Sequence, residues 1–189
     1  MLTEYVLIKQ QSLKLIVREA DMKFDANFCN VTTNHEIRPG EIYSLSFRMD
    51  LYAEAKTFYV KIGIALPTSS GKFESFIQNS VTDVCKYLKR NNSNIMLRLF
   101  FNGHFGDKKF PTTCPVKSDV YYIEKFRIKE NMLTIRSIQT KILIAVDFCI
   151  DLPQKNMHCI LNTKFEAEVK DRQKWLQEVE MRRQSNDKI

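Results

Sequence analysis

Two stretches of this chain carry an apolar residue at every second position, and this alternation constrains the fold more than any other feature. They are "IYSLSFRMDLY" (residues 42–52) and "KTFYVKIGIALP" (residues 56–67). A period of two places every second side chain on one face of an extended strand, so each stretch predicts a strand with one apolar face. The apolar positions are Tyr43, Leu45, Phe47, Met49 and Leu51 in the first stretch, and Phe58, Val60, Ile62, Ile64 and Leu66 in the second.

Weaker alternation predicts further strands, and a Pro39-Gly40 turn separates the first of them from the stretch at 42–52. The additional predicted strands cover residues 13–17, 121–128, 140–151 and 159–169, and the third of these carries Ile142, Ile144, Val146 and Phe148 on one face. Six or seven strands with one apolar face each are typical of antiparallel sheets that pack on one another. The predicted fold class is therefore mainly β, an antiparallel two-sheet sandwich or cup.

Two segments break the strand pattern. Val84, Tyr87 and Leu88 have helical spacing behind Asp83, which is a suitable N-cap, and Asn94 is a candidate cap for a second short helix. After residue 169 the chain is highly charged, with a thin apolar stripe at Trp175, Leu176 and Val179. We expect a β domain over residues 1–169 with a short helical insertion, followed by a charged helical tail over residues 170–189.

Several classes of function lack support. The five cysteines show no CxxC spacing and the three histidines do not cluster, so no metal or other cofactor is expected. No GxSxG, HExxH, P-loop or GxGxxG motif is present, and no base is placed beside a thiol, so no enzyme activity is expected. The net charge of +7 arises from 29 basic and 22 acidic residues that are interspersed. This pattern is typical of solvated outer faces, so nucleic acid is not an expected partner.

Membrane and secretion signals give a mixed picture. No apolar run approaches the roughly 20 residues that a spanning helix needs. The first residues are interrupted by Glu4, Lys9 and Lys14 and do not resemble a secretory leader. Glycosylation sequons nevertheless begin at Asn30 and Asn91, and both asparagines are expected to be exposed and modified if the chain enters the secretory pathway.

Several short motifs, in order, carry a family resemblance. They are "KFDANFCN", "IRPGEIYSLSF", "SFIQNSVTDVCKYLKR", "FPTTCPVKSDVYYIEKF" and "NMHCILNTKFEAEV". The third contains Asp83, Cys85, Lys86, Tyr87 and Leu88, and the fourth contains Cys114 and Pro115. Together they resemble the insect family of small secreted proteins related to the ganglioside activator, over Phe24 to Val169.

The resemblance implies a lipid-recognition fold of the ML type, with a hydrophobic cavity between two sheets, and a link to chemosensory perception and pheromone detection. It also implies disulfide bonds Cys85–Cys114 and Cys29–Cys159, with Cys149 free. A Cys149–Cys159 bond is the alternative, because ten residues suit a hairpin pair. Five free thiols in a cytosolic protein are a further alternative.

The predicted function is that of a secreted, non-enzymatic binding protein for an apolar small molecule such as a lipid, fatty acid or hydrocarbon pheromone. The expected cavity residues are Phe47, Met49, Phe58, Val60, Phe101, Ile144 and Phe148. Patterning does not distinguish a cavity from a filled core. The alternative is therefore a secreted interaction module with a filled interior that acts through its surface on a receptor at the cell surface.

Overall fold

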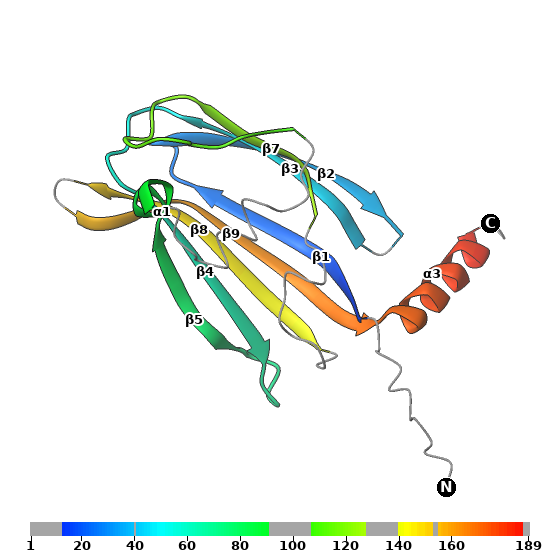
Figure 1. Ribbon diagram of the computed structural model, residues 1–189. Helices are drawn as coiled ribbons and strands as arrows, with labels where there is room; N and C mark the ends of the chain where they lie inside the picture. The colour runs from blue at the N-terminus through cyan, green and yellow to red at the C-terminus, as the bar shows by residue number, and fades with distance from the viewer. Residues whose placement is uncertain (1–12, 40, 91–106, 128–139, 153–154, 187–189) are drawn as a thin grey trace, which may run out of the picture.

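The computed structural model describes residues 13–39, 41–90, 107–127, 140–152 and 155–186. Within these residues, nine β-strands and two α-helices form a sandwich of two antiparallel sheets (Figure 1). The strands are β1 (Leu13–Phe24), β2 (Cys29–Arg38), β3 (Glu41–Leu51), β4 (Phe58–Pro67), β5 (Phe73–Asp83), β6 (Lys108–Lys109), β7 (Val120–Phe126), β8 (Lys141–Leu152) and β9 (Lys155–Asp171). The helices are α1 (Val84–Arg90) and α3 (Arg172–Asn186).

The two sheets differ in size. The larger sheet has five strands in the order β1-β9-β8-β4-β5, and the smaller sheet has four in the order β2-β3-β7-β6. All strand pairs are antiparallel. In Figure 1, α1 lies at one end of the sandwich and α3 extends from the opposite end. The predicted fold class is confirmed.

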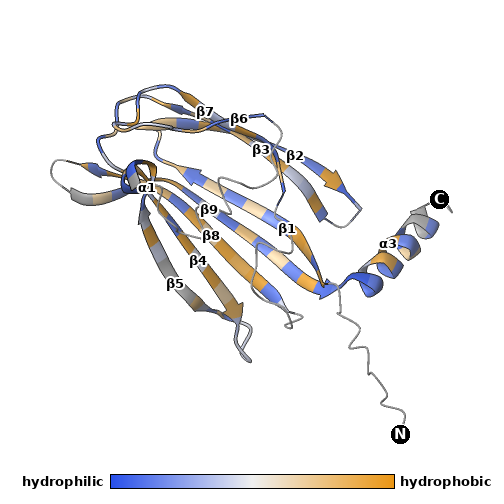
Figure 2. Cartoon of the chain, viewed as in Figure 1, coloured by the Kyte–Doolittle hydropathy of each residue, from blue (hydrophilic) through white to orange (hydrophobic). Residues whose placement is uncertain are grey.

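Alternating side chains build the interior between the sheets. On β4, Phe58, Val60 and Ile62 are buried, and on β8 every second residue from Ile142 to Phe148 is buried. Figure 2 shows that apolar residues predominate along both strands. These inward faces join in one hydrophobic cluster with residues of β3 and β9, so the period-two pattern fixed which face of each strand is buried.

Three strands were not predicted from the sequence: β2, β5 and the two-residue β6. The segment around Cys29 was expected to be a loop, yet it forms the edge strand β2, on which only Cys29 and Val31 are buried. β5 is likewise an edge strand, and its Phe76 and Val81 are exposed. Edge strands present little buried surface, so they need not alternate clearly in hydrophobicity.

A bulge in β7 changes the pairing register between the end of β7 and β3. Phe47 is paired with Ile123, but the next pair is Leu45 with Phe126, so β7 contains one additional residue between the two pairs. Lys125 absorbs this extra length in the left-handed region with φ of 52°, and its backbone N–H donates to the hydroxyl of Ser46 at 3.0 Å. The bulge thereby sets Phe126 opposite Leu45.

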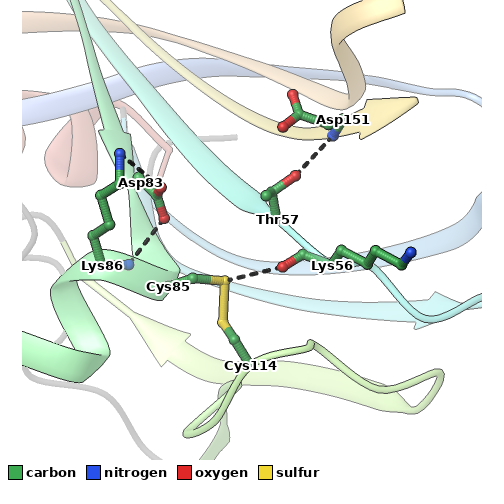
Figure 3. The surroundings of a disulfide bond; sticks show 7 residues. All are labelled: Lys56, Thr57, Asp83, Cys85, Lys86, Cys114 and Asp151. Atoms are coloured by element: carbon green, nitrogen blue, oxygen red, sulfur yellow. Dashed lines mark hydrogen bonds and ion pairs between the residues drawn. A yellow bond between two sulfur atoms is a disulfide. The ribbon is translucent and has the colours of Figure 1, made fainter. Parts of the chain in front are cut away.

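The short helix α1 is fixed at its start by a cap and a disulfide. The Asp83 carboxylate accepts a hydrogen bond from the backbone N–H of Lys86 at 2.9 Å, which confirms Asp83 as the cap. Cys85 is joined to Cys114, as predicted, and its sulfur lies 3.8 Å from the carbonyl oxygen of Lys56 (Figure 3). The bond ties α1 to the segment that leads into β7.

The predicted Cys29–Cys159 bond is wrong. Cys159 is bonded to Cys149, and Cys29 is a free, fully buried thiol. The reason is strand register, because Cys149 and Cys159 are direct partners across β8 and β9, whereas Cys29 lies on β2 in the other sheet. The Cys29 thiol instead donates to the carbonyl of Ile160 at 3.5 Å.

The predicted C-terminal helix is confirmed and is tied to the larger sheet. The Asp171 carboxylate caps α3 by accepting from the backbone N–H groups of Gln173 and Lys174. Lys170 on β9 pairs with Glu178 on the helix at 3.0 Å. Among the described residues, no helix is both long and apolar enough to span a bilayer.

Candidate ligand-binding site

The residues predicted to line a cavity gather in the middle of the sandwich. Met49, Phe58, Val60, Ile144 and Phe148 are buried members of the hydrophobic cluster, and Phe47 is partly buried against it. Phe101 lies outside the described residues. That these side chains border a ligand cavity stays a prediction.

Three aromatic rings connect the two sheets within this cluster. The ring centre of Phe148 on β8 lies 6.2 Å from that of Phe47 on β3 and 5.9 Å from that of Phe58 on β4. Both ring pairs are tilted, at separations typical of favourable aromatic contacts. Phe47 belongs to the smaller sheet and the other two to the larger one, so the contact spans the interior.

A pocket of about 220 Å³ opens between the sheets where β1 and β9 face β3 and β7. Its wall is apolar toward the interior, and Leu15, Leu45 and Phe165 belong to both the pocket and the hydrophobic cluster. An apolar cavity of roughly 150 Å³ holds a benzene-sized molecule, so this space accommodates a small apolar group. We call it the interlayer pocket; its lining residues are Lys14, Leu15, Val17, Ala20, Glu41, Ile42, Tyr43, Ser44, Leu45, Phe126, Arg127 and Phe165.

Charged side chains stand beside a tyrosine in the wall of the interlayer pocket. Arg127, which directly follows β7, donates a hydrogen bond to the hydroxyl of Tyr43 on β3. The guanidinium carbon of Arg127 lies 3.9 Å from the centre of the Tyr43 ring, and that of Arg38 lies 3.1 Å from it. Two guanidinium groups therefore contact one aromatic ring, an arrangement stabilised by cation–π attraction.

The two arginines differ in their acidic partners. Arg38 donates to the Glu36 carboxylate at 3.1 Å, and this hydrogen bond, with a further one from Ser44, holds the pKa of Glu36 below its usual value. Arg127 is only partly exposed, and among the described residues it forms no ion pair with a carboxylate. Arg127 therefore lacks a direct ion pair with a described carboxylate, although its charge contributes to the lowered pKa of Glu36.

A second pocket of about 250 Å³ adjoins the interlayer pocket on the side of α3. The two share Lys14, Glu41 and Tyr43. Lys14 pairs with the buried Glu41 at 3.4 Å and lies 4.9 Å from the ring centre of Trp175 on α3. The start of α3 therefore borders the same region as the pocket.

The interlayer pocket was not predicted from the sequence, although several of its lining residues belong to predicted strands. Tyr43 and Leu45 belong to the first alternating stretch, and Leu15 and Val17 belong to a predicted strand. Their proximity depends on which strands face one another across the layers, and one sequence does not contain that information. Arg127 falls within the predicted strand at residues 121–128, but it was not identified as a site residue, because the bulge in β7 interrupts the alternation before it.

The remaining predicted sites are distributed as follows. Asn30 is exposed on β2, although a loop was expected there, and Asn91 lies outside the described residues. Within the part of the chain that the structure describes, no group of three or more His, Cys, Asp or Glu side chains is placed to hold a metal ion.

Comparison with known proteins gives one family match. Residues 60–140 match the model of a family described as a protein of unknown function (DUF1091). The match begins within β4 and ends just before β8. No curated protein matches the chain.

Proposed function

We propose that this chain is a secreted, non-enzymatic binding protein that holds an apolar small molecule between its two sheets. The observation that carries this proposal is the interlayer pocket, whose apolar wall is continuous with the interior of the sandwich. Ligand sites commonly combine apolar surface with polar groups that fix orientation, and this pocket has an apolar inner wall beside polar side chains such as Tyr43 and Arg127. The bound molecule is a lipid, a fatty acid or a hydrocarbon signal.

The resemblance to insect proteins related to the ganglioside activator supports the same function. It spans Phe24 to Val169, and it implies an ML-type fold that holds lipids between two sheets. The two-sheet architecture and the Cys85–Cys114 bond are in keeping with that relationship. A role in chemosensory perception follows from the resemblance and is part of this proposal.

Two disulfide bonds support secretion. Disulfides persist mainly in oxidising compartments, and this chain has two, one within the larger sheet and one that joins α1 to the segment before β7. The exposed sequon at Asn30 fits the same compartment.

Binding in this proposal is driven by transfer of the ligand's chain out of water. Each buried methylene contributes about 0.8 kcal/mol, so eight methylenes contribute about 6 kcal/mol before ordering costs. The protein's role is sequestration and delivery, with no bond made or broken.

Native mass spectrometry of protein secreted from a eukaryotic host tests the proposal. We expect a population heavier than the polypeptide and its glycans by the mass of a lipid-sized molecule, which is lost on denaturation. Added fatty acid or alcohol should give a one-to-one complex. Failure to form any complex with either class would contradict the proposed function.

A second candidate function has a specific observation in its favour. Met49 and Val60 are almost fully buried, and Phe148 contacts Phe47 and Phe58, which is also how a filled core packs. With a filled core the chain would act through its surface on a receptor. Titration with a fluorescent fatty-acid probe distinguishes the candidates, because a folded protein with a filled interior would bind no probe whereas the interlayer pocket would take it up.

A further inference from the structure

We propose that the mouth of the interlayer pocket is a subsite for the carboxylate head of an amphiphile, with Arg127 as the group that binds it. The inference rests on the proposed function, since the apolar chain attached to that head would occupy the space between the sheets. It adds a ligand class, a medium- or long-chain carboxylic acid. It also adds an orientation, with the acid group beside Arg127.

The position of Arg127 relative to the apolar wall is the first step. Arg127 directly follows Phe126, whose side chain lines the pocket together with Leu45 and Phe165. A ligand chain resting on this apolar wall would have its head within reach of the Arg127 side chain. The site therefore offers an apolar surface and a cation side by side, which matches the two parts of a fatty acid.

The charge of Arg127 is the second step. Lys14 pairs with Glu41 and Arg38 with Glu36, whereas Arg127 forms no ion pair with a described carboxylate and only contributes, at longer range, to the lowered pKa of Glu36. A partly buried cation is costly to keep without an anion. A ligand carboxylate would supply it, and a guanidinium accommodates a carboxylate with two parallel hydrogen bonds.

Tyr43 acts as a positioning residue for this arginine. Its hydroxyl accepts the hydrogen bond from Arg127 and its ring lies beside both the Arg127 and the Arg38 guanidinium groups. These contacts restrict the rotamers of Arg127 before a ligand arrives. Such preorganisation reduces the ordering cost of binding.

The net positive charge around the pocket also favours a ligand that carries a single negative charge. Lys14, Arg127 and Arg38 line the two adjoining pockets, and Arg172 lines the pocket beside α3. The neighbouring acids are Glu41, which is buried against Lys14, and Glu36, which is paired with Arg38. Four cations against two carboxylates leave an excess of positive charge, which attracts an anionic head toward the opening.

The test compares a carboxylic acid with an alcohol of the same length. The full chain is loaded with the neutral fluorescent probe N-phenyl-1-naphthylamine at pH 7.5 and titrated with dodecanoate or with dodecan-1-ol. We expect dodecanoate to bind about ten-fold or more tightly than the alcohol in the wild type, as a charge-assisted hydrogen bond predicts. In Arg127→Gln this preference should fall to within about two-fold, mainly through weaker binding of dodecanoate.

Two further variants separate a local contact from general charge. Arg48→Gln removes an equal charge from β3, where Arg48 is exposed and paired with Asp50, and should retain the full preference for the acid. Arg127→Lys keeps the charge without the planar guanidinium and should retain part of it. Tyr43→Phe removes the acceptor of Arg127 and should weaken acid binding with little change for the alcohol.

The outcomes are distinguishable. Equal wild-type affinities for acid and alcohol would overturn the carboxylate subsite and leave the proposed function standing. If Arg48→Gln and Arg127→Gln lost the preference for the acid over the alcohol to the same extent, the subsite would also be overturned, because the effect would then come from net charge. Absence of binding for the probe, the acid and the alcohol in a folded protein would overturn both.

Discussion

Cys149 and Cys159 lie directly opposite each other on the antiparallel strands β8 and β9, and a disulfide bond joins them across the pair. The other bond, Cys85–Cys114, joins parts of the chain that do not pair as strands. The two bonds therefore constrain the unfolded chain to different extents. The first closes a separation of 10 residues and the second a separation of 29.

This difference predicts a ranking of the two bonds. Loop-closure entropy assigns about 2.7 kcal/mol to a ten-residue loop and about 3.6 kcal/mol to a loop of roughly 29 residues. The double variant Cys85→Ala with Cys114→Ala should lower the free energy of unfolding by about 1 kcal/mol more than Cys149→Ala with Cys159→Ala. Urea unfolding of both variants measures this, and the reverse order would contradict the entropic account.

The free thiol of Cys29 should be unreactive in the folded protein. Burial, with a smaller effect of the Asp25 carboxylate, raises the pKa of Cys29 to about 11, so the reactive thiolate is scarce at pH 8. Without a reducing agent, iodoacetamide should modify no cysteine of the native chain and one cysteine, Cys29, after denaturation. Peptide mapping that found Cys149 alkylated instead would contradict the observed pairing.

The surroundings of Asp25 predict that its carboxylate contributes to the loss of folding stability at acid pH. The backbone N–H of Asn27 and then the side chain of His158, 2.8 Å away, hydrogen-bond the Asp25 carboxylate and lower its pKa below the usual value. A lowered pKa stabilises the fold above the unfolded-state value of about 3.9, and that stability is lost as the pH falls through the folded-state pKa.

Asp25→Asn should therefore reduce stability at neutral pH and make the acid limb of the stability curve shallower. Melting temperatures between pH 2 and pH 7 measure both effects. Asp21→Asn, on the exposed part of β1, serves as the control and should leave the curve almost unchanged. Parallel curves for the wild type and Asp25→Asn would contradict the assignment.

The sequon at Asn30 predicts a glycan on β2. The side chain is exposed at the second position of an edge strand, so an attached sugar meets no neighbouring strand on that side. Intact mass of protein secreted from insect cells should fall by one glycan in Asn30→Gln. An unshifted mass for the wild type would remove this support for secretion.

Most of the fold could be predicted because inward faces repeat with period two. β3, β4 and β8 alternate clearly, and their apolar positions meet in the interior. β2 was missed because an edge strand that buries only Cys29 and Val31 has little hydrophobic pattern. The wrong cysteine pair has a related cause, since the cross-strand register that brings Cys149 to Cys159 is a property of the folded sheet.

The candidate site was predictable only in part. The apolar character of its wall follows from strand alternation, and Leu45 was identified on that basis. The placement of Arg127 beside Tyr43 depends on the bulge at Lys125, which shifts the end of β7 relative to β3. A local insertion of one residue has no clear signature in hydrophobicity, so it was not found.

The central claim is that an apolar chain enters the sandwich through the interlayer pocket. Ala20 on β1 is a partly buried residue of that pocket, and a tryptophan there would fill the space without enlarging the residues of the interior. Ala145 on β8 is the matched control, because it alternates with the buried Ile144 and Val146 and so lies on the opposite face of the sheet.

Titration of N-phenyl-1-naphthylamine into the wild type, Ala20→Trp and Ala145→Trp tests this claim most directly. We expect saturable one-to-one binding by the wild type and by Ala145→Trp. Ala20→Trp should lose at least about ten-fold in affinity while the protein stays folded, because the ring occupies the space that the probe would fill. Saturable binding by Ala20→Trp with wild-type affinity, or none by the folded wild type, would contradict the account.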